Sequence, residues 1–148
     1  MAQQDQQQTE VRRVHINYLA VVVSAVVAFL LGGLWYSPVL FAKMWVRAHG
    51  YSEEQVKEMQ GRAGKGYAAS VLCLLLIALA MAALASYLQL GRPGQGLKLG
   101  LLGWGGFAFP LGLMAYMYSG KRITTLIIDA GYQLVYMLVM GSIITIWQ

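Results

Sequence analysis

The stretch YLAVVVSAVVAFLLGGLWYSP, residues 18–38, decides the fold. It carries no charged residue and belongs to an apolar run from about Ile16 to Tyr36, close to the roughly 20 residues that a helix needs to cross about 30 Å of hydrocarbon. Lipid offers no hydrogen-bond partner to the backbone, so such a run must be helical in a membrane. It closes with two glycines that let a neighbour approach, with Trp35 and Tyr36 as interfacial anchors, and with Pro38 as a stop.

Composition extends this interpretation to the whole chain. Of its 148 residues 58% are hydrophobic and 11% charged, whereas a soluble domain carries about 25% charged residues. The net charge of +5 comes from basic residues in short connecting segments, where they face lipid head groups rather than nucleic acid. The single cysteine, Cys73, excludes an internal disulfide, and its apolar surroundings are typical of a buried small hydrophobe.

The chain is predicted to be an all-α integral membrane protein with four transmembrane helices in an up-down bundle. Short connections, QLGRPGQG and SGKR, make the last three helices antiparallel neighbours. The polar, Gln-rich residues 1–15 are predicted to be a disordered tail, and residues 16–148 a single transmembrane domain. The expected spans run over about residues 16–36, 67–90, 96–118 and 123–147.

The connection between the first two spans, residues 37–66, is longer. Ser52 followed by Gln55 three residues later reads as a capping box, which predicts a short interfacial helix over about residues 53–60. Upstream, VLFAKMWVRAHG, residues 39–50, mixes apolar rings with basic residues. It is either a segment lying along the membrane interface or an irregular loop.

Basic residues suggest an orientation, because they are retained on the cytoplasmic side. The end that holds both termini carries Arg12, Arg13, Arg92 and Lys98. The opposite end carries Lys43, Arg47, Lys57, Arg62, Lys65, Lys121 and Arg122. This bias predicts a multi-pass protein of the cell inner membrane with periplasmic termini and a cytoplasmic 37–66 loop.

Small residues should join the helices, since lipid is as apolar as leucine and association depends on close packing. The expected packing residues are Ser24, Ala28, Gly32, Gly33, Ala78, Ala82, Gly100 and Gly103. Pro110 follows Gly105 and Gly106 in the third span, and its missing N–H predicts a kink there.

Asp129 is the only acid inside a predicted span. A carboxylate at the bilayer centre costs about 2.5–3.5 kcal/mol on insertion scales, which makes it a candidate site. One polar stripe runs along its helix: Thr125, Asp129, Tyr132, Gln133 and Tyr136. Either the carboxylate pairs structurally with Lys121 or Arg122 near the helix start, or it handles a proton, an ion or a ligand.

Connectivity places the end of the first span and the start of the fourth at one membrane face. Trp35, Tyr36 and Asp129 should therefore share a depth. Their rings either form an ordinary aromatic belt or line a pocket with the acid near its floor. The candidate ligand- or ion-binding residues are Asp129, Tyr132, Gln133, Tyr136, Trp35, Tyr36 and Ser37.

Catalytic chemistry finds little support in the sequence. His15 and His49 fall at opposite membrane faces, which argues against a two-histidine metal or haem site. HExxH, P-loop and Ser-His-Asp patterns are absent from the sequence. We therefore expect no enzyme activity, no catalytic residue, no cofactor and no metal.

The chain resembles a family of small bacterial four-span membrane proteins that is known only as a domain of unknown function. The resemblance covers about residues 17–147 and is carried by a G-x-L-W-Y-S-P motif, a Gly-Phe-x-x-Pro element and a D-x-G-Y segment. The matching positions are Gly33, Leu34, Trp35, Tyr36, Ser37, Pro38, Lys43, Trp45, Gly106, Phe107, Pro110, Asp129, Gly131 and Tyr132. The resemblance implies an architecture and no activity.

Two functions are compatible with these features. The first is a non-catalytic structural or accessory subunit in the lipid bilayer, which forms a homo-oligomer or joins a larger membrane complex and does not bind nucleic acid. The alternative is a small solute or proton-coupled transporter or channel that uses Asp129 in an aromatic-lined cavity; a carrier this short would need two copies.

Overall fold

The computed structural model describes residues 15–147. Residues 1–14 of the predicted disordered tail, which include Arg12 and Arg13, lie outside this range. Within it the chain is helical and contains no strand, which confirms the predicted all-α class. Four helical stretches are long and apolar enough to cross a membrane.

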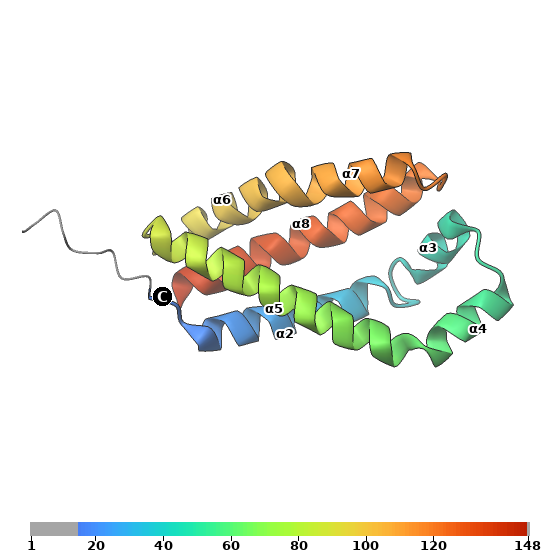
Figure 1. Ribbon diagram of the computed structural model, residues 1–148, viewed down its shortest axis with the longest axis horizontal. Coiled ribbons are helices and arrows are strands. Elements are labelled where there is room, and N and C mark those ends of the chain that lie inside the picture. Colours follow the sequence, from blue (N-terminus) through green and yellow to red (C-terminus); the bar gives the residue numbers. More distant parts are fainter. Residues whose placement is uncertain (1–14, 148) are drawn as a thin grey trace, which may run out of the picture.

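The first two membrane helices are α2 (Tyr18–Trp35) and α5 (Ala63–Tyr87). The third stretch is built from α6 (Pro93–Gly103), η1 (Trp104–Ala108) and α7 (Phe109–Met117), and the fourth is α8 (Ile123–Ile146). Two short helices, α3 (Ala42–His49) and α4 (Glu53–Gly61), lie between α2 and α5. They stand at the end of the bundle opposite the C-terminus (Figure 1).

Local sequence explains the helix ends. Asn17 caps α2, because its Oδ1 accepts hydrogen bonds from the backbone N–H groups of Leu19 and Ala20. Its side-chain Nδ2 donates a hydrogen bond to the Trp147 carbonyl at 2.6 Å. The start of α2 and the end of α8 are thereby tied together. The capping box of α4 is present as predicted, with Ser52 and Gln55 exchanging hydrogen bonds.

The segment of residues 39–50 forms a helix over most of its length, so of the two expectations the irregular loop is wrong. Gly50 ends α3 in the left-handed conformation, with φ of 72°. α3 folds back over the bundle and packs against α8. This return brings a loop residue into the membrane site described below.

The helix α8 is the centre of the bundle and contacts α2, α3, α5, α6 and α7. Met140 and Ile144 on α8 are almost fully buried. Gly96 and Gly100 of α6 lie against the α8 backbone, where a Cβ on either glycine would collide with a main-chain carbonyl. These contacts are the close approach that small residues permit in lipid.

The other expected packing residues differ in their surroundings. Ser24, Ala28, Ala78 and Ala82 are buried at the core, in the paired helices α2 and α5. Three glycines show the range: a Cβ on Gly32 would meet Tyr132, one on Gly103 would meet Met137, and one on Gly33 would meet nothing within 4 Å.

Before Pro110, where a kink was predicted, the structure has a π-helical turn. The Phe109 N–H donates to the Trp104 carbonyl, five residues back, and the chain continues as α7. Pro110 lacks an N–H, and a wider turn before it changes the pairing of the carbonyls without ending the helix. Trp104 fixes this turn to α8 by donating from Nε1 to the Ala130 carbonyl at 2.9 Å.

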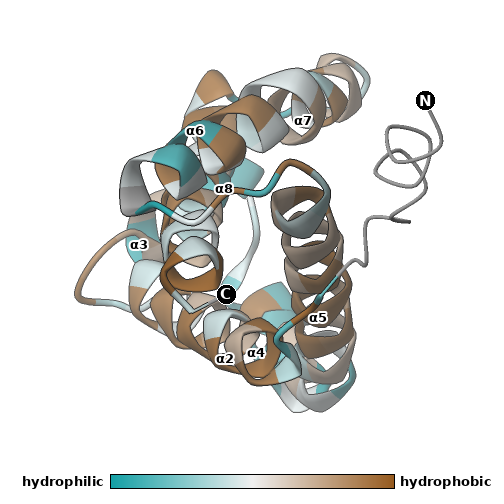
Figure 2. Ribbon diagram, turned by 90° about the vertical axis from the view of Figure 1, so that its left-hand side faces the viewer, coloured by the Kyte–Doolittle hydropathy of each residue, from teal (hydrophilic) through white to brown (hydrophobic). Residues whose placement is uncertain are grey.

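The outer faces of the bundle are apolar. Hydrophobic residues run along the length of α2 and α5 (Figure 2). In the third stretch only 11% of the apolar window is buried, against 39% for α8. Of the four stretches, α6–η1–α7 is therefore the least buried within the bundle.

Candidate functional site

The carboxylate of Asp129 joins three segments that are far apart in the sequence. Its Oδ1 accepts a hydrogen bond from the hydroxyl of Tyr36 at 2.8 Å and one from the indole Nε1 of Trp45 at 2.9 Å. Tyr36 follows the last residue of α2, Trp45 belongs to α3, and Asp129 belongs to α8. Hydrogen bonds to an ionised acceptor are roughly twice as strong as neutral ones, so this oxygen is a strong fastening point.

The Trp-Tyr-Ser-Pro end of the first span produces this arrangement. Pro38 cannot continue a helix, and the chain turns so that the Phe41 N–H donates to the Trp35 carbonyl at 3.1 Å. The turn directs α3 toward α8. Trp35 adds a second tie, since its Nε1 donates to the Ile128 carbonyl at 3.1 Å, one residue before the acid.

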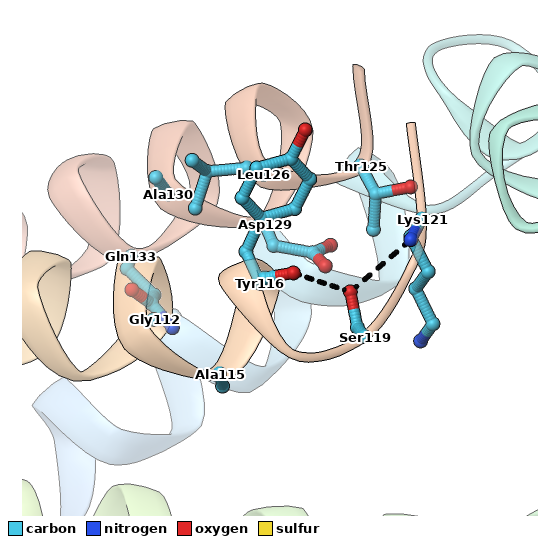
Figure 3. A pocket seen from close by; sticks show the side chains of 10 residues that line it. All are labelled: Gly112, Ala115, Tyr116, Ser119, Lys121, Thr125, Leu126, Asp129, Ala130 and Gln133. Carbon is cyan, nitrogen blue, oxygen red and sulfur yellow. Dashed lines mark hydrogen bonds between the residues drawn. The ribbon is translucent and has the colours of Figure 1, made fainter. Parts of the chain in front are cut away.

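The predicted pairing of Asp129 with Lys121 or Arg122 is not present. In the described part of the chain the one ion pair is Arg62 with Glu58, at 3.1 Å on the surface. The donors to Asp129 are uncharged and come from the α2 and α3 side. Figure 3 shows the ammonium group of Lys121 turned away from the carboxylate. Of the two expectations for this acid, the structural pairing with Lys121 or Arg122 is therefore wrong, because Tyr36 at the end of α2 and Trp45 of α3 supply the donors instead.

Tyr36 remains a neutral donor. Burial, together with the hydrogen bond to Asp129, raises the pKa of the Tyr36 phenol above its ordinary value. The phenol therefore keeps its proton at neutral pH and donates a hydrogen bond to the carboxylate.

A row of aromatic rings leads from the loop into the bundle. Ring centroids are separated by 5.9 Å between Trp45 and Tyr36, 5.5 Å between Tyr36 and Tyr132, and 4.9 Å between Tyr132 and Tyr136. Such spacings are typical of attractive aromatic pairs. The rings thus contact one another, and two of them, those of Tyr36 and Trp45, also donate hydrogen bonds to the acid.

A groove of about 410 Å³ opens beside this row, between α5 and the α8 helix. Its lining is made of Tyr36, Trp45, Ser70, Cys73, Leu74, Ile77, Asp129, Tyr132, Gln133 and Tyr136. Cys73 is exposed on this groove, so the expectation that it is buried is wrong. An apolar run predicts contact with an apolar medium, which in this protein is not the same as burial in the core.

A second pocket of about 200 Å³ lies on the other side of the acid, between α7 and α8 (Figure 3). It is lined by Gly112, Ala115, Tyr116, Ser119, Lys121, Thr125, Leu126, Asp129, Ala130 and Gln133. Asp129 and Gln133 therefore line both hollows. Thr125 is 5% exposed, and its buried Oγ1 has no hydrogen-bond partner in the part of the chain that the structure describes.

The structure brings together most of the candidate residues. Tyr36, Asp129, Tyr132, Gln133 and Tyr136 line one groove. The two others are near without lining either hollow: Trp35 binds the α8 backbone, and the buried Oγ of Ser37 has no hydrogen-bond partner among residues 15–147.

Trp45 is the contact that the candidate set lacked. Its apolar and basic neighbours indicated an interfacial segment, but nothing in them indicated which helix that segment would cover.

The site offers few groups for metal binding. Among residues 15–147, no group of three or more His, Cys, Asp and Glu side chains is placed to hold a metal ion. His49 packs against Trp45 at 3.9 Å between ring centroids and stacks on Tyr51 at 5.0 Å. What the site offers is a carboxylate, hydroxyl and amide groups, and aromatic faces.

Comparison with known proteins gives a family and nothing finer. Neither the curated proteins nor the solved structures contain a match to this chain. A family model described as "Protein of unknown function (DUF1761)" matches residues 19–145.

Proposed function

Because the chain belongs to this family of unknown function, we propose a role from its geometry: a non-catalytic structural or accessory subunit of a membrane assembly. The protein would self-associate or join a larger complex. The observation that supports this role best is the use of Asp129 as a fastening point. The only acid in the membrane helices accepts two hydrogen bonds at one oxygen, and these bonds hold the loop helix α3 and the end of α2 against α8.

The exposed third stretch offers a surface for a partner helix. Gly105 and Gly106 in the π-helical turn face open space, with nothing within 4 Å of a Cβ built on either. Leu102 and Phe107 beside them are each 71% exposed. Small residues between large apolar ones are typical of close helix contacts in lipid, and we propose a second copy of this chain as the occupant.

The proposed location is the inner membrane of a bacterium, with the termini in the periplasm. The end of the bundle that carries α3, α4 and the α7–α8 connection holds more of the lysines and arginines than the other end. The positive-inside bias then favours a cytoplasmic position for α3 and α4.

Self-association can be tested by changing the open glycine surface. Gly106→Leu should lower the cross-linked dimer fraction in native membranes, because the added side chain prevents a second helix from approaching. Gly64→Leu, also in open space but at the start of α5, is the matched control. An unchanged dimer fraction in Gly106→Leu would mean that lipid covers this face and that the proposed contact is wrong.

The fastening role can be tested at Asp129 itself. Asp129→Asn keeps a carbonyl oxygen for both donors, whereas Asp129→Leu removes the acceptor. Assembly should survive the first change and be lost in the second. If both variants assemble as the wild type does, the carboxylate is not a structural fastening point.

A second candidate function is a small solute or proton-coupled carrier. The observation that favours it is that Asp129 and Gln133 line hollows on two sides of α8. A carrier would lose proton-linked uptake in proteoliposomes when Asp129→Asn is introduced, while its assembly stays intact. Uptake that is equal in wild type and variant would exclude this use of the acid.

A further inference from the structure

The groove between α5 and α8 combines a carboxylate with a continuous aromatic wall. We propose that this groove binds an organic ammonium ion, with the charged nitrogen beside Asp129 and its alkyl groups against the rings of Tyr36 and Tyr136. The inference deepens the second candidate function, because it names the class of ligand, but it concerns binding and does not require transport.

The charge of the lining supports a cation. Asp129 is the only formally charged residue among the residues that line the groove. The pocket on the other side of α8 differs in this respect, because its lining includes Lys121. In a groove of low dielectric constant, one carboxylate without a neighbouring lysine or arginine attracts a positive ligand.

The aromatic wall supports an organic cation. A ring face attracts a positive charge within about 6 Å of its centroid, and alkylammonium groups are the ligands best suited to several such faces. Tyr36, Tyr132 and Tyr136 follow one another at centroid distances of 5.5 and 4.9 Å along this wall. The rings offer charge stabilisation and apolar contact in one place.

The oxygen atoms of the site favour the same class. Both hydrogen bonds to the carboxylate go to Oδ1, and among the described residues none is recorded to Oδ2. The proposal assigns Oδ2 to the alkylammonium ion, because contact at that oxygen leaves the bonds from Tyr36 and Trp45 to Oδ1 in place. A Ca²⁺ ion would need about six to eight oxygen ligands, and the lining adds only a few polar side chains, such as Ser70 and Gln133.

The native cysteine provides a direct readout. Cys73 lines the groove, is exposed and is the only cysteine of the chain. In lipid nanodiscs, the probe benzyltrimethylammonium should slow the alkylation of Cys73 by N-ethylmaleimide in a saturable manner. Neopentylbenzene, which has the same shape without the charge, should protect much less at the same concentration.

Variants separate charge from shape. Asp129→Asn should raise the half-protecting probe concentration about tenfold or more, because it removes the charge but keeps an acceptor oxygen. Glu58→Gln removes an equal charge from the surface helix α4 and should leave that concentration unchanged. At Tyr136, the Phe variant should bind better than the Leu variant, because only the former keeps the ring.

Two results would overturn the inference: absence of saturable protection by the ammonium probe, or equal protection by its neutral analogue. Loss of protection in Tyr136→Phe and Tyr136→Leu alike would also contradict a role for the ring face. Dimer formation and proton-linked uptake are measured without the probe. A failure of binding is therefore distinguishable from a failure of either proposed function.

Discussion

The indole Nε1 of Trp45 lies 2.9 Å from Oδ1 of Asp129, although 84 residues separate the two in the sequence. This bond, with the one from Tyr36, is what holds α3 over the end of α8. Because the acceptor is a carboxylate in a half-buried site, the contact is a charge-assisted one. It makes the loop between α2 and α5 a part of the bundle rather than a free connection.

Trp45→Phe should release α3 while leaving the membrane helices folded. The change removes one hydrogen bond to a charged group, a loss of about 1.5–3 kcal/mol. Lys43 and Arg47 are exposed on α3, so trypsin should cut there faster in the variant. The control variant Trp147→Phe, which changes the other end of the bundle, should be cut by trypsin at the wild-type rate. If the two variants are equally resistant, the bond does not hold the loop.

Gly32→Ala should destabilise the contact between α2 and α8. A Cβ at this position would lie 2.7 Å from the Tyr132 hydroxyl, which donates to the Ala28 carbonyl at 3.0 Å. Overpacking of this kind costs about 1–3 kcal/mol, and thermal unfolding in detergent should show a lower Tm.

Gly33→Ala is the matched control, because a Cβ there meets nothing within 4 Å. Since alanine favours a helix over glycine by about 1 kcal/mol, its Tm should stay level or rise. Tyr132→Phe combined with Gly32→Ala should recover part of the loss, because the closest atom is gone. A similar drop in Tm for both glycine variants would show that the Tyr132 contact is not the cause.

Sequence alone predicted the parts of this molecule that depend on length and connectivity. Four apolar runs with short loops allow one economical bundle, and the same connectivity brought Trp35, Tyr36 and Asp129 to one end of it. The capping box at Ser52 and Gln55 is a local signal and was read from local residues. These features depend on contacts that are near in sequence or forced by the membrane.

The rest depended on contacts that no local pattern encodes. The apolar and basic residues around Trp45 are compatible with several positions on the membrane surface, so its bond to Asp129 was not predicted. The charge of Lys121 suggested a partner for that acid, but neutral donors on the returning loop reach it instead. Pro110 and the glycines before it indicated a kink, and nothing in them indicated the π-helical turn that the structure has there.

Gly100→Ala should separate α6 from α8. Its added Cβ would collide with the main-chain carbonyl of Met137, and a backbone atom cannot move aside as a flexible side chain can. We expect a loss of about 1–3 kcal/mol or more and a lower Tm. Gly105→Ala changes the same stretch in open space and should be close to neutral. Since alanine favours a helix over glycine, equal losses in both variants would show that the contact with the Met137 carbonyl is not the cause.

The up-down order and the proposed orientation can be tested together with single cysteines in a Cys73→Ala background. Val39 and Tyr118 are 83% and 93% exposed, and they follow α2 and α7 at the same end of the bundle. Gln89 is an exposed residue of the α5–α6 connection at the opposite end. A membrane-impermeant maleimide should therefore label positions 39 and 118 from one side of sealed vesicles and position 89 from the other.

In right-side-out vesicles the positive-inside bias predicts labelling at 89 alone. Labelling at 39 and 118 alone would reverse the orientation but keep the bundle, whereas labelling of 39 and 118 from opposite sides would contradict the four-crossing fold itself.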